Sequence, residues 1–282
     1  MAHHHRNQNR PVSRYRPPGI IPLELWDLKI GDRILWDAMN EPEFPSLLFA
    51  VLREVHAGRG ESRSDGPISS EAAGFDAVYL CGGRAKDEGF RKIAEQAPWP
   101  VLRSEGDAFA GERGGLELLS SSGWEGLVVD LGQTQLKISA ANRRWTFPRD
   151  FERLPMRHTL SAEQHPEQRR ELRRFLGASL CQCARETAMP VEALVVSLPA
   201  RIDDAGVPEG CSYAGMAGDA HLVPNSLAIA GFGGAKYWLL NDAELAALSA
   251  RFHPGIASYA RTLVLTLGFG VGAAVLISDG RD

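Results

Sequence analysis

The hydrophobic pattern predicts strands and amphipathic helices in alternation along the second half of the chain. Apolar runs at residues 126–131, 136–139 and 145–147 are separated by tight turns, which is typical of three strands that meander. An amphipathic helix is predicted over residues 166–188, followed by a buried strand over residues 193–198. The remaining elements predicted in this half are a glycine-rich stretch to residue 234 that is mostly loop, a strand at 237–240, a helix at 243–251, and strands at 262–267 and 273–277.

The first half alternates in a similar way but is interrupted more often. Residues 20–25 have the alternation of a half-buried strand, and residues 34–56 carry a helical periodicity that Pro42 and Pro45 interrupt. The glycine- and serine-rich residues 58–74 are typical of a loop. The remaining predicted elements are a strand at 77–81, a helix around 90–96, a strand at 100–102 and a glycine-rich helix ending at residue 119.

Two segments fall outside this pattern. Residues 1–19 contain several arginines and three histidines with almost no apolar periodicity, and we interpret them as a flexible tail. Residues 120–125 begin with serines and a glycine, the composition of a flexible linker. A boundary between two lobes is expected at this linker.

Size and composition are those of a globular protein with two lobes. The 282 residues are near the length at which a single hydrophobic core stops growing, and 44% of them are hydrophobic. A formal net charge of −4 gives no broad cationic surface for nucleic acid, and the apolar stretches are too short or too glycine-rich to span a bilayer. The four cysteines match neither a disulfide framework nor a zinc pattern, which indicates reduced thiols. We therefore expect a cytoplasmic protein with no nucleic-acid or membrane partner.

A candidate phosphate-binding turn follows the first of the three meandering strands. Gly132 lets a backbone approach a phosphate, the Thr134 hydroxyl can donate a hydrogen bond, and the Asp130 carboxylate can hold a water of a magnesium ion. Gln133 lies inside this turn and Lys137 follows it. An ordinary hairpin turn would contain the same residue types, so both interpretations remain open.

A second candidate turn contains the closely spaced glycines Gly268, Gly270 and Gly272 between two predicted strands. Backbone N–H groups in such a turn can surround a phosphate. A dinucleotide-binding fold would require a helix after these glycines, whereas residues 273–277 are predicted to be a strand, so that interpretation is rejected. A plain β-hairpin remains the alternative.

Asn241 and Asp242 stand between a predicted strand and a predicted helix. A carboxylate at this place can accept the proton of a substrate hydroxyl during phosphoryl transfer, and the amide can orient that hydroxyl. The alternative is a helix N-cap, which needs no catalytic role.

Gly82 and Gly83 follow the predicted strand at 77–81, where glycines would admit an adenine ring or a ribose against the backbone. A tight turn between a strand and a helix is the alternative interpretation.

Taken together, these features resemble the ROK (repressor, ORF, kinase) group of sugar kinases in the actin-like ATPase superfamily. The similarity covers residues 126–280 in the order of that family. It comprises the aspartate–glycine–threonine turn, a strand that ends at Pro199, the pair Asn241 and Asp242 before an alanine-rich helix, and the second glycine-rich turn.

The resemblance implies an α/β fold of two ribonuclease H-like lobes with a cleft between them, here in circularly permuted order. In the family, the second glycine-rich turn is followed by the rest of the nucleotide-binding lobe, whereas in this chain the matching elements come first. A sugar-binding and catalytic lobe is therefore expected at residues 126–260. The nucleotide-binding lobe would combine residues 20–119 with residues 261–282.

The resemblance also implies an activity, which is ATP-dependent phosphorylation of a hydroxyl on a hexose or an amino sugar. Asp242 would be the general base, Asn241 and Pro199 would contact the sugar, and Asp130 would hold Mg²⁺ through water. The nucleotide- and phosphate-binding residues implied by the resemblance are Asp130, Gly132, Gln133, Thr134, Lys137, Gly268, Gly270, Gly272, Gly82 and Gly83. A small-molecule sugar is the expected partner, and a homodimer is the oligomer we consider.

The chain departs from the family pattern in ways that define the alternatives. Phe269 stands where a threonine is usual, and residues 20–56 contain neither the family's glutamate–glycine–histidine sugar motif nor its cysteine-rich zinc motif. These departures favour, as the alternative function, a nucleotide- or sugar-binding module with weak or no catalysis. A DNA-binding repressor is disfavoured because the basic tail is short and contains no helix-turn-helix pattern.

Overall fold

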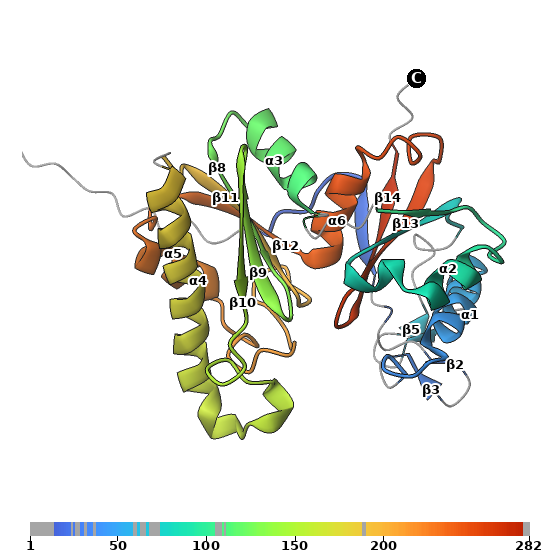
Figure 1. The fold of residues 1–282 in the computed structure, drawn as a ribbon, viewed down its shortest axis with the longest axis horizontal. Helices are drawn as coiled ribbons and strands as arrows, with labels where there is room; N and C mark the ends of the chain where they lie inside the picture. Colours follow the sequence, from blue (N-terminus) through green and yellow to red (C-terminus); the bar gives the residue numbers. More distant parts are fainter. Residues whose placement is uncertain are drawn as a thin grey trace, which may run out of the picture.

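Two five-stranded sheets and six α-helices make up most of the described part of the chain in the computed structural model (Figure 1). The structure describes residues 14–23, 25, 29–30, 33–35, 38–58, 61–62, 66–67, 74–104, 109, 111–187 and 190–278. Most of the predicted tail, residues 1–13, and the last four residues therefore lie outside the described residues. The minor elements are the strand pairs β2 (Lys29–Ile30) with β3 (Arg33–Ile34) and β4 (Glu61–Ser62) with β5 (Gly66–Pro67), and 3-10 helices at Gly83–Lys86, Arg157–Thr159 and Ala162–Gln164.

The first sheet comes from one continuous stretch of the chain. It has the order β10-β9-β8-β11-β12, in which β8, β9 and β10 are antiparallel neighbours and β11 runs parallel to both β8 and β12. The predicted meander and the buried fourth strand are confirmed, because an apolar run suits a strand enclosed between parallel neighbours. The strands are β8 (Gly126–Leu131), β9 (Gln135–Ala140), β10 (Arg143–Pro148), β11 (Ala193–Leu198) and β12 (Lys236–Asn241).

The second sheet is assembled from both ends of the chain. Its order is β1-β14-β13-β6-β7, in which β14 is antiparallel to β1 and β13, whereas β6 is parallel to β13 and β7. If its strands are taken in the order β13, β14, β1, β6, β7, their arrangement and directions are those of the first sheet. The strands are β1 (Ile20–Leu23), β6 (Ala77–Cys81), β7 (Val101–Arg103), β13 (Arg261–Leu267) and β14 (Val271–Ile277).

The start of β1 and the end of β14 lie side by side. Ile20 is paired with Leu276, and the backbone N–H of Ile277 donates to the carbonyl oxygen of Gly19 at 2.7 Å. Strands that neighbour each other in this antiparallel way are usually joined by a short hairpin. Here the two strands are instead separated by nearly the whole length of the chain.

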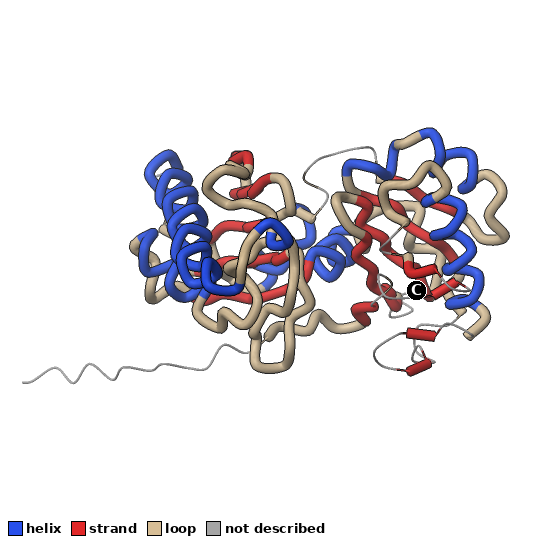
Figure 2. Tube along the Cα trace, turned by 90° about the horizontal axis from the view of Figure 1, so that it is seen from below, coloured by secondary structure: helices blue, strands red, loops and turns tan. Residues whose placement is uncertain are grey.

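The helices form three groups around the sheets (Figure 2). One group packs on the outer face of the first sheet, a second covers the second sheet, and a third lies between the two sheets. Adjacent residues of β8 show this division, because Leu127 and Val129 join the outer core whereas Val128 joins the core between the sheets. The groups are α4 (His165–Thr187) with α5 (Leu222–Ala230), α1 (Phe44–His56) with α2 (Glu88–Ala94), and α3 (Glu112–Ser121) with α6 (Asp242–Ala250).

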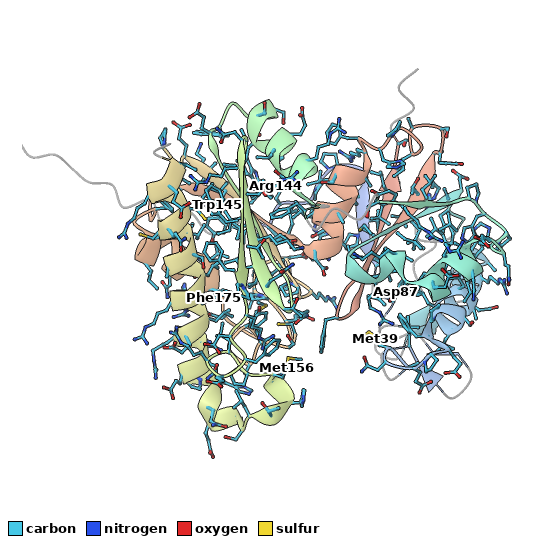
Figure 3. The ribbon with its side chains drawn as sticks, in the orientation of Figure 1. Met39, Asp87, Arg144, Trp145, Met156 and Phe175 are labelled. Atoms are coloured by element: carbon cyan, nitrogen blue, oxygen red, sulfur yellow. The ribbon has the colours of Figure 1, made fainter. Side chains whose placement is uncertain are left out.

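Close packing of α3 ties the layer between the sheets to the first sheet. A Cβ atom on Gly114 would lie 2.4 Å from the backbone nitrogen of Ser249 in α6. Arg144 of β10, which is labelled in Figure 3, forms an ion pair with Glu112 of α3. The predicted linker at 120–125 differs from this structure. Its first residues complete α3, and Gly123 follows as a tight turn with φ of 71°. Serine and glycine here end a packed helix instead of forming a flexible connection.

Two helices differ from the prediction. Helix α5 occupies part of the stretch that was predicted to be mostly loop, because most of its residues are apolar and it lacks the polar stripe that marks a surface helix. It packs against α4, where a Cβ atom on Gly177 would lie 2.7 Å from Ile229. Helix α1 begins at Phe44, ten residues after the predicted start, with Pro45 in its first turn.

Candidate functional site

Asp130 lies near the end of β8 with polar partners on both neighbouring strands. Lys137 on β9 is its cross-strand partner, and its Nζ lies 3.0 Å from Asp130 Oδ2. Ser197 on β11 is its partner on the other side, and the hydroxyl donates to Asp130 Oδ1 at 3.3 Å. Both members of the ion pair keep about a fifth of their side-chain surface exposed, 22% for Asp130 and 19% for Lys137. The carboxylate is thus fixed in place while one side remains accessible.

The turn after Asp130 is a tight connection between β8 and β9. The Gly132 N–H closes it by donating to the Gln135 carbonyl at 2.9 Å. The side-chain amide of Gln133 donates to the Pro199 carbonyl at 3.4 Å, which brings two predicted site residues together. The hairpin that we considered as an alternative describes the backbone of this turn.

Asn241 caps helix α6. Its Oδ1 accepts the N–H of Glu244 at 2.7 Å, and Glu244 Oε2 accepts the N–H of Asn241 at 2.8 Å, which is a complete capping box. The cap interpretation of Asn241 is therefore confirmed. The oxygen of its side chain is engaged in the helix, so a contact with a sugar would fall to the amide nitrogen.

Asp242 is the first residue of α6 and lies where the two sheets meet. Its Oδ1 accepts the N–H of Ala243 at 2.9 Å. Gly272 of β14 faces it, since a Cβ atom there would lie 2.9 Å from Asp242 Oδ1 and 2.3 Å from the hydroxyl oxygen of Thr266. The Thr266 hydroxyl is buried and has no hydrogen-bond partner among the described residues. A residue of the first sheet's helix is thus brought against the glycine-rich strand of the second sheet.

The electrostatic surroundings of Asp242 disfavour its charged form. Burial is the largest cause and the negative charge of Asp130 is the next, and together they raise the pKa of Asp242 to about 7, against the opposing effect of Lys137. The side chain nevertheless keeps a partly exposed surface. A carboxyl group that titrates near neutral pH is suited to accept a proton from a hydroxyl and release it again.

The second candidate turn is the tip of the β13–β14 hairpin. The Gly268 N–H donates to the Gly270 carbonyl at 3.0 Å, and Phe269 between them is 45% exposed. The turn therefore lies between two strands, as predicted, and the helix of a dinucleotide-binding fold is absent, since β14 follows directly.

Gly82 lies beside Leu267, where β13 ends at this turn, and Gly83 follows it. Gly82 has φ of 90°, and a Cβ atom there would lie 2.6 Å from the carbonyl oxygen of Leu267, so both its conformation and its surroundings require glycine. Gly83 begins a 3-10 helix and has nothing within 4 Å of an added Cβ. The preceding residue, Cys81, is buried near Asp242, and burial raises the pKa of its thiol to about 12, which leaves it protonated.

Residues 14–19, which were predicted to belong to the flexible tail, pack against both sheets. Arg14 forms a buried ion pair with Glu244 of the capping box, with 2.9 Å between Arg14 Nη2 and Glu244 Oε1. The ring of Tyr15 meets that of Trp238 on β12 edge to face, with 6.1 Å between centroids. The sequence carries no local signal for these contacts, because the partners are more than 200 residues away.

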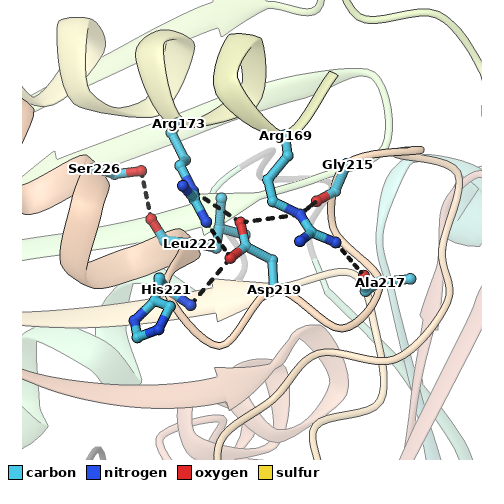
Figure 4. Close-up of polar contacts among 8 residues, drawn as sticks. All are labelled: Arg169, Arg173, Gly215, Ala217, Asp219, His221, Leu222 and Ser226. Atoms are coloured by element: carbon cyan, nitrogen blue, oxygen red, sulfur yellow. Dashed lines mark hydrogen bonds and ion pairs between the residues drawn. The ribbon is translucent and has the colours of Figure 1, made fainter. Parts of the chain in front are cut away.

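The loop between β11 and α5 contributes further residues that the sequence analysis missed. Its Tyr213 hydroxyl donates to the Gly132 carbonyl at 2.9 Å, and its Ser212 contacts the buried side chain of Arg149. The loop is anchored on α4, where Arg173 Nε lies 2.9 Å from the buried carboxylate of Asp219 (Figure 4). The Gly132–Thr134 turn is therefore supported by a loop that is far away in the sequence.

Two absences apply to the described residues alone. No group of three or more histidine, cysteine, aspartate or glutamate side chains there is arranged to hold a metal ion. No helix in the same residues is long and apolar enough to cross a membrane.

Comparison with known proteins gave no match to a protein-family model, a curated protein or a solved structure.

Proposed function

We propose that the protein is an ATP-dependent sugar kinase built from two ribonuclease H-like lobes of the actin-like ATPase kind. The equal strand order and strand directions of the two sheets support this fold. In such folds the ligands lie between the lobes, and α6 with Asp242 lies between the two sheets.

Circular permutation explains why the second sheet uses both ends of the chain. A connection from β14 to β1 would complete three antiparallel strands in sequence, as in the first sheet. The contact between Ile277 and Gly19 supports this explanation, because permutation requires the original connection points to lie close together at the surface.

The observation that carries the proposed activity is the position of Asp242. It stands beside Gly272 of the second glycine-rich turn, and its pKa responds to Asp130 at the first turn. In the proposed reaction, a sugar hydroxyl transfers its proton to Asp242 as its oxygen bonds to the γ-phosphorus of ATP. The bond between that phosphorus and the bridging oxygen breaks, and ADP leaves with the electron pair.

The nucleotide would be held by the two turns. The N–H groups of Gln133 and Thr134, the Thr134 hydroxyl and the glycines of the β13–β14 hairpin would face the phosphates. Gly83, where an added Cβ meets nothing within 4 Å, would leave space for the adenosine. Lys137 would add a positive charge. Mg²⁺, held through water by Asp130, would neutralise the charge that develops on the transferred group.

Release of ADP across a panel of hexoses, amino sugars and N-acetylated sugars tests the activity, and Asp242→Asn tests the base. We expect roughly a 10²- to 10⁴-fold loss of turnover in Asp242→Asn with the affinity for Mg-ADP retained. Asp87→Asn, which replaces an exposed carboxylate at the N-cap position of α2 (Figure 3), is the matched control and should keep wild-type turnover. Wild-type turnover in Asp242→Asn would show that another group is the base.

The exposed Phe269 favours a second candidate function, a binding module with weak or no catalysis. A phenylalanine offers no hydroxyl to a phosphate, although it stands in the turn where the resemblance implies a threonine. Calorimetry separates the two functions. Binding of a sugar or of Mg-ADP without ADP release over the whole panel would favour the module.

A further inference from the structure

Arg149 is a buried arginine whose hydrogen bonds go to neutral oxygens. It is 4% exposed, and its guanidinium donates to the carbonyls of Leu154 at 2.7 Å, Pro155 at 2.7 Å and Gln133 at 3.0 Å. It also donates to the hydroxyl and carbonyl oxygens of Ser212, at 2.8 and 3.2 Å. Burial lowers the pKa of Arg149, but an arginine side chain remains charged in proteins. A full positive charge is therefore held against the Gly132–Thr134 turn.

Three consecutive carbonyl groups of this turn are engaged by the same support. Tyr213 donates its hydroxyl to the Gly132 carbonyl at 2.9 Å, the Arg149 guanidinium donates to the Gln133 carbonyl, and the Arg149 backbone N–H donates to the Thr134 carbonyl at 2.8 Å. The guanidinium also stacks on the Tyr213 ring, 3.8 Å from its centroid. The two side chains therefore act as one unit.

The direction of the carbonyls fixes the direction of the amides. In a trans peptide the C=O and N–H groups point in opposite directions, and the described residues contain no cis peptide. Because the Gly132 and Gln133 carbonyls point toward Tyr213 and Arg149, the N–H groups of Gln133 and Thr134 point away from them. Neither N–H has an acceptor among the described residues. Two adjacent free donors of this kind suit an anion.

We propose that Arg149, together with Tyr213, is a positioning residue that orients the Gln133 and Thr134 amides toward a phosphate group. This inference rests on the proposed function for the identity of the ligand, Mg-ADP or Mg-ATP. Arg149 acts through the turn, and its buried charge adds to the attraction because buried charges are weakly screened. The loop that carries Tyr213 is in turn held on α4 by the Asp219 ion pairs (Figure 4).

The test uses two conservative variants and one control in the full-length protein. Arg149→Lys keeps the charge but loses the forked donor geometry, and Tyr213→Phe removes one hydrogen bond while keeping the stacked ring. Arg143→Met is the control, since Arg143 begins the strand that Arg149 follows but is half exposed and pairs with Glu186 on the outer face. The free energy of unfolding of each variant is measured by urea denaturation, so that weaker binding is separated from loss of fold.

The first measurement is calorimetric binding of Mg-ADP. We expect Kd to rise roughly tenfold or more in Arg149→Lys and roughly three- to tenfold in Tyr213→Phe, with no change beyond about twofold in Arg143→Met. A Kd within about twofold of wild type in both Arg149→Lys and Tyr213→Phe would overturn the positioning role.

The second measurement does not depend on nucleotide binding. Hydrogen exchange of the Gly132 amide in the ligand-free protein reports whether the turn is held, because this N–H is bonded to Gln135. We expect roughly tenfold faster exchange in Arg149→Lys and unchanged exchange in Arg143→Met. If the wild type binds no nucleotide, the proposed function fails. An unchanged exchange rate of the Gly132 amide in Arg149→Lys would show separately that Arg149 does not hold the turn.

Discussion

The two sheets have the same strand order but carry different kinds of side chain at the matching position of the central strand. On the first sheet, Asp130 of β8 lies between Lys137 and Ser197 on the neighbouring strands. On the second sheet, the matching residue is Thr266 of β13, whose neighbours are Gly272 and Cys81. Each of these central residues stands two positions before a glycine that begins a turn. One sheet therefore supplies fixed charges and the other supplies small or neutral side chains.

The two glycine-containing turns are also held by different kinds of group. The Gly132–Thr134 turn is held by a buried arginine and a tyrosine hydroxyl. The β13–β14 turn is closed by its own backbone bond between Gly268 and Gly270. Two sheets with the same topology can thus carry different side chains. The charged groups are concentrated on the first sheet, where the proposed reaction would take place. The following predictions test this division, in order of decreasing effect.

Gly272→Ala should cause a large loss of turnover. The added methyl group would meet the Thr266 hydroxyl and the Asp242 carboxylate, both closer than 3.0 Å, so one of them must move. We expect turnover to fall roughly 100-fold, because displacement of a catalytic group by about 1 Å can have that effect. The matched control is Gly234→Ala, where an added Cβ meets nothing within 4 Å. Unchanged turnover in Gly272→Ala would mean that the second sheet does not border the reacting groups.

Asp242→Asn should make the protein more stable, with an effect that depends on pH. The pKa of Asp242 is about 7 in the folded protein and near 4 in the unfolded chain. Ionisation of Asp242 therefore destabilises the folded state, and this destabilisation is absent below pH 4 and complete above pH 7. We expect the variant to gain about 2 kcal/mol in the free energy of unfolding at pH 8, which is less than the full shift implies because the side chain is partly exposed.

Urea denaturation at pH 4 and pH 8 measures this gain. Asp87→Asn, which replaces an exposed carboxylate on the side of the second sheet, is the control and should show no comparable gain at pH 8. A gain in Asp242→Asn that is equal at both pH values would rule out the raised pKa as its cause.

Moving the chain termini to another place in the fold should have the smallest effect on the free energy of unfolding. We would join Ser278 to Gly19 through an Asn-Gly turn and open the chain between Ser122 and Gly123, which are both exposed. The reference is a chain that lacks residues 1–18 but is otherwise unaltered, because both forms lose the Arg14–Glu244 ion pair. We expect their free energies of unfolding to agree within about 1 kcal/mol. A relocated chain that does not fold, beside a reference that does, would contradict the equivalence of the two sheets.

Local pattern in the sequence determined a large part of the fold. The meander of the first sheet, the buried strand β11, helix α4 and the Asn241 cap were all predicted from patterns that span a few residues. The same local patterns indicated both glycine-containing turns and the place of Asp242 after a strand. These predictions succeed because periodicity, turn residues and caps act over short distances along the chain.

Only the tertiary structure decided how these pieces meet. Helix α5 becomes a helix by packing against α4, and β1 finds its partner at the opposite end of the chain. The support of the first turn by Arg149 and Tyr213 likewise depends on a loop more than 60 residues away. Buried polar groups must find partners wherever the fold brings them, so such contacts leave no periodic signal in the sequence. The sequence determined which elements form, and long-range packing determined which side chains share the site.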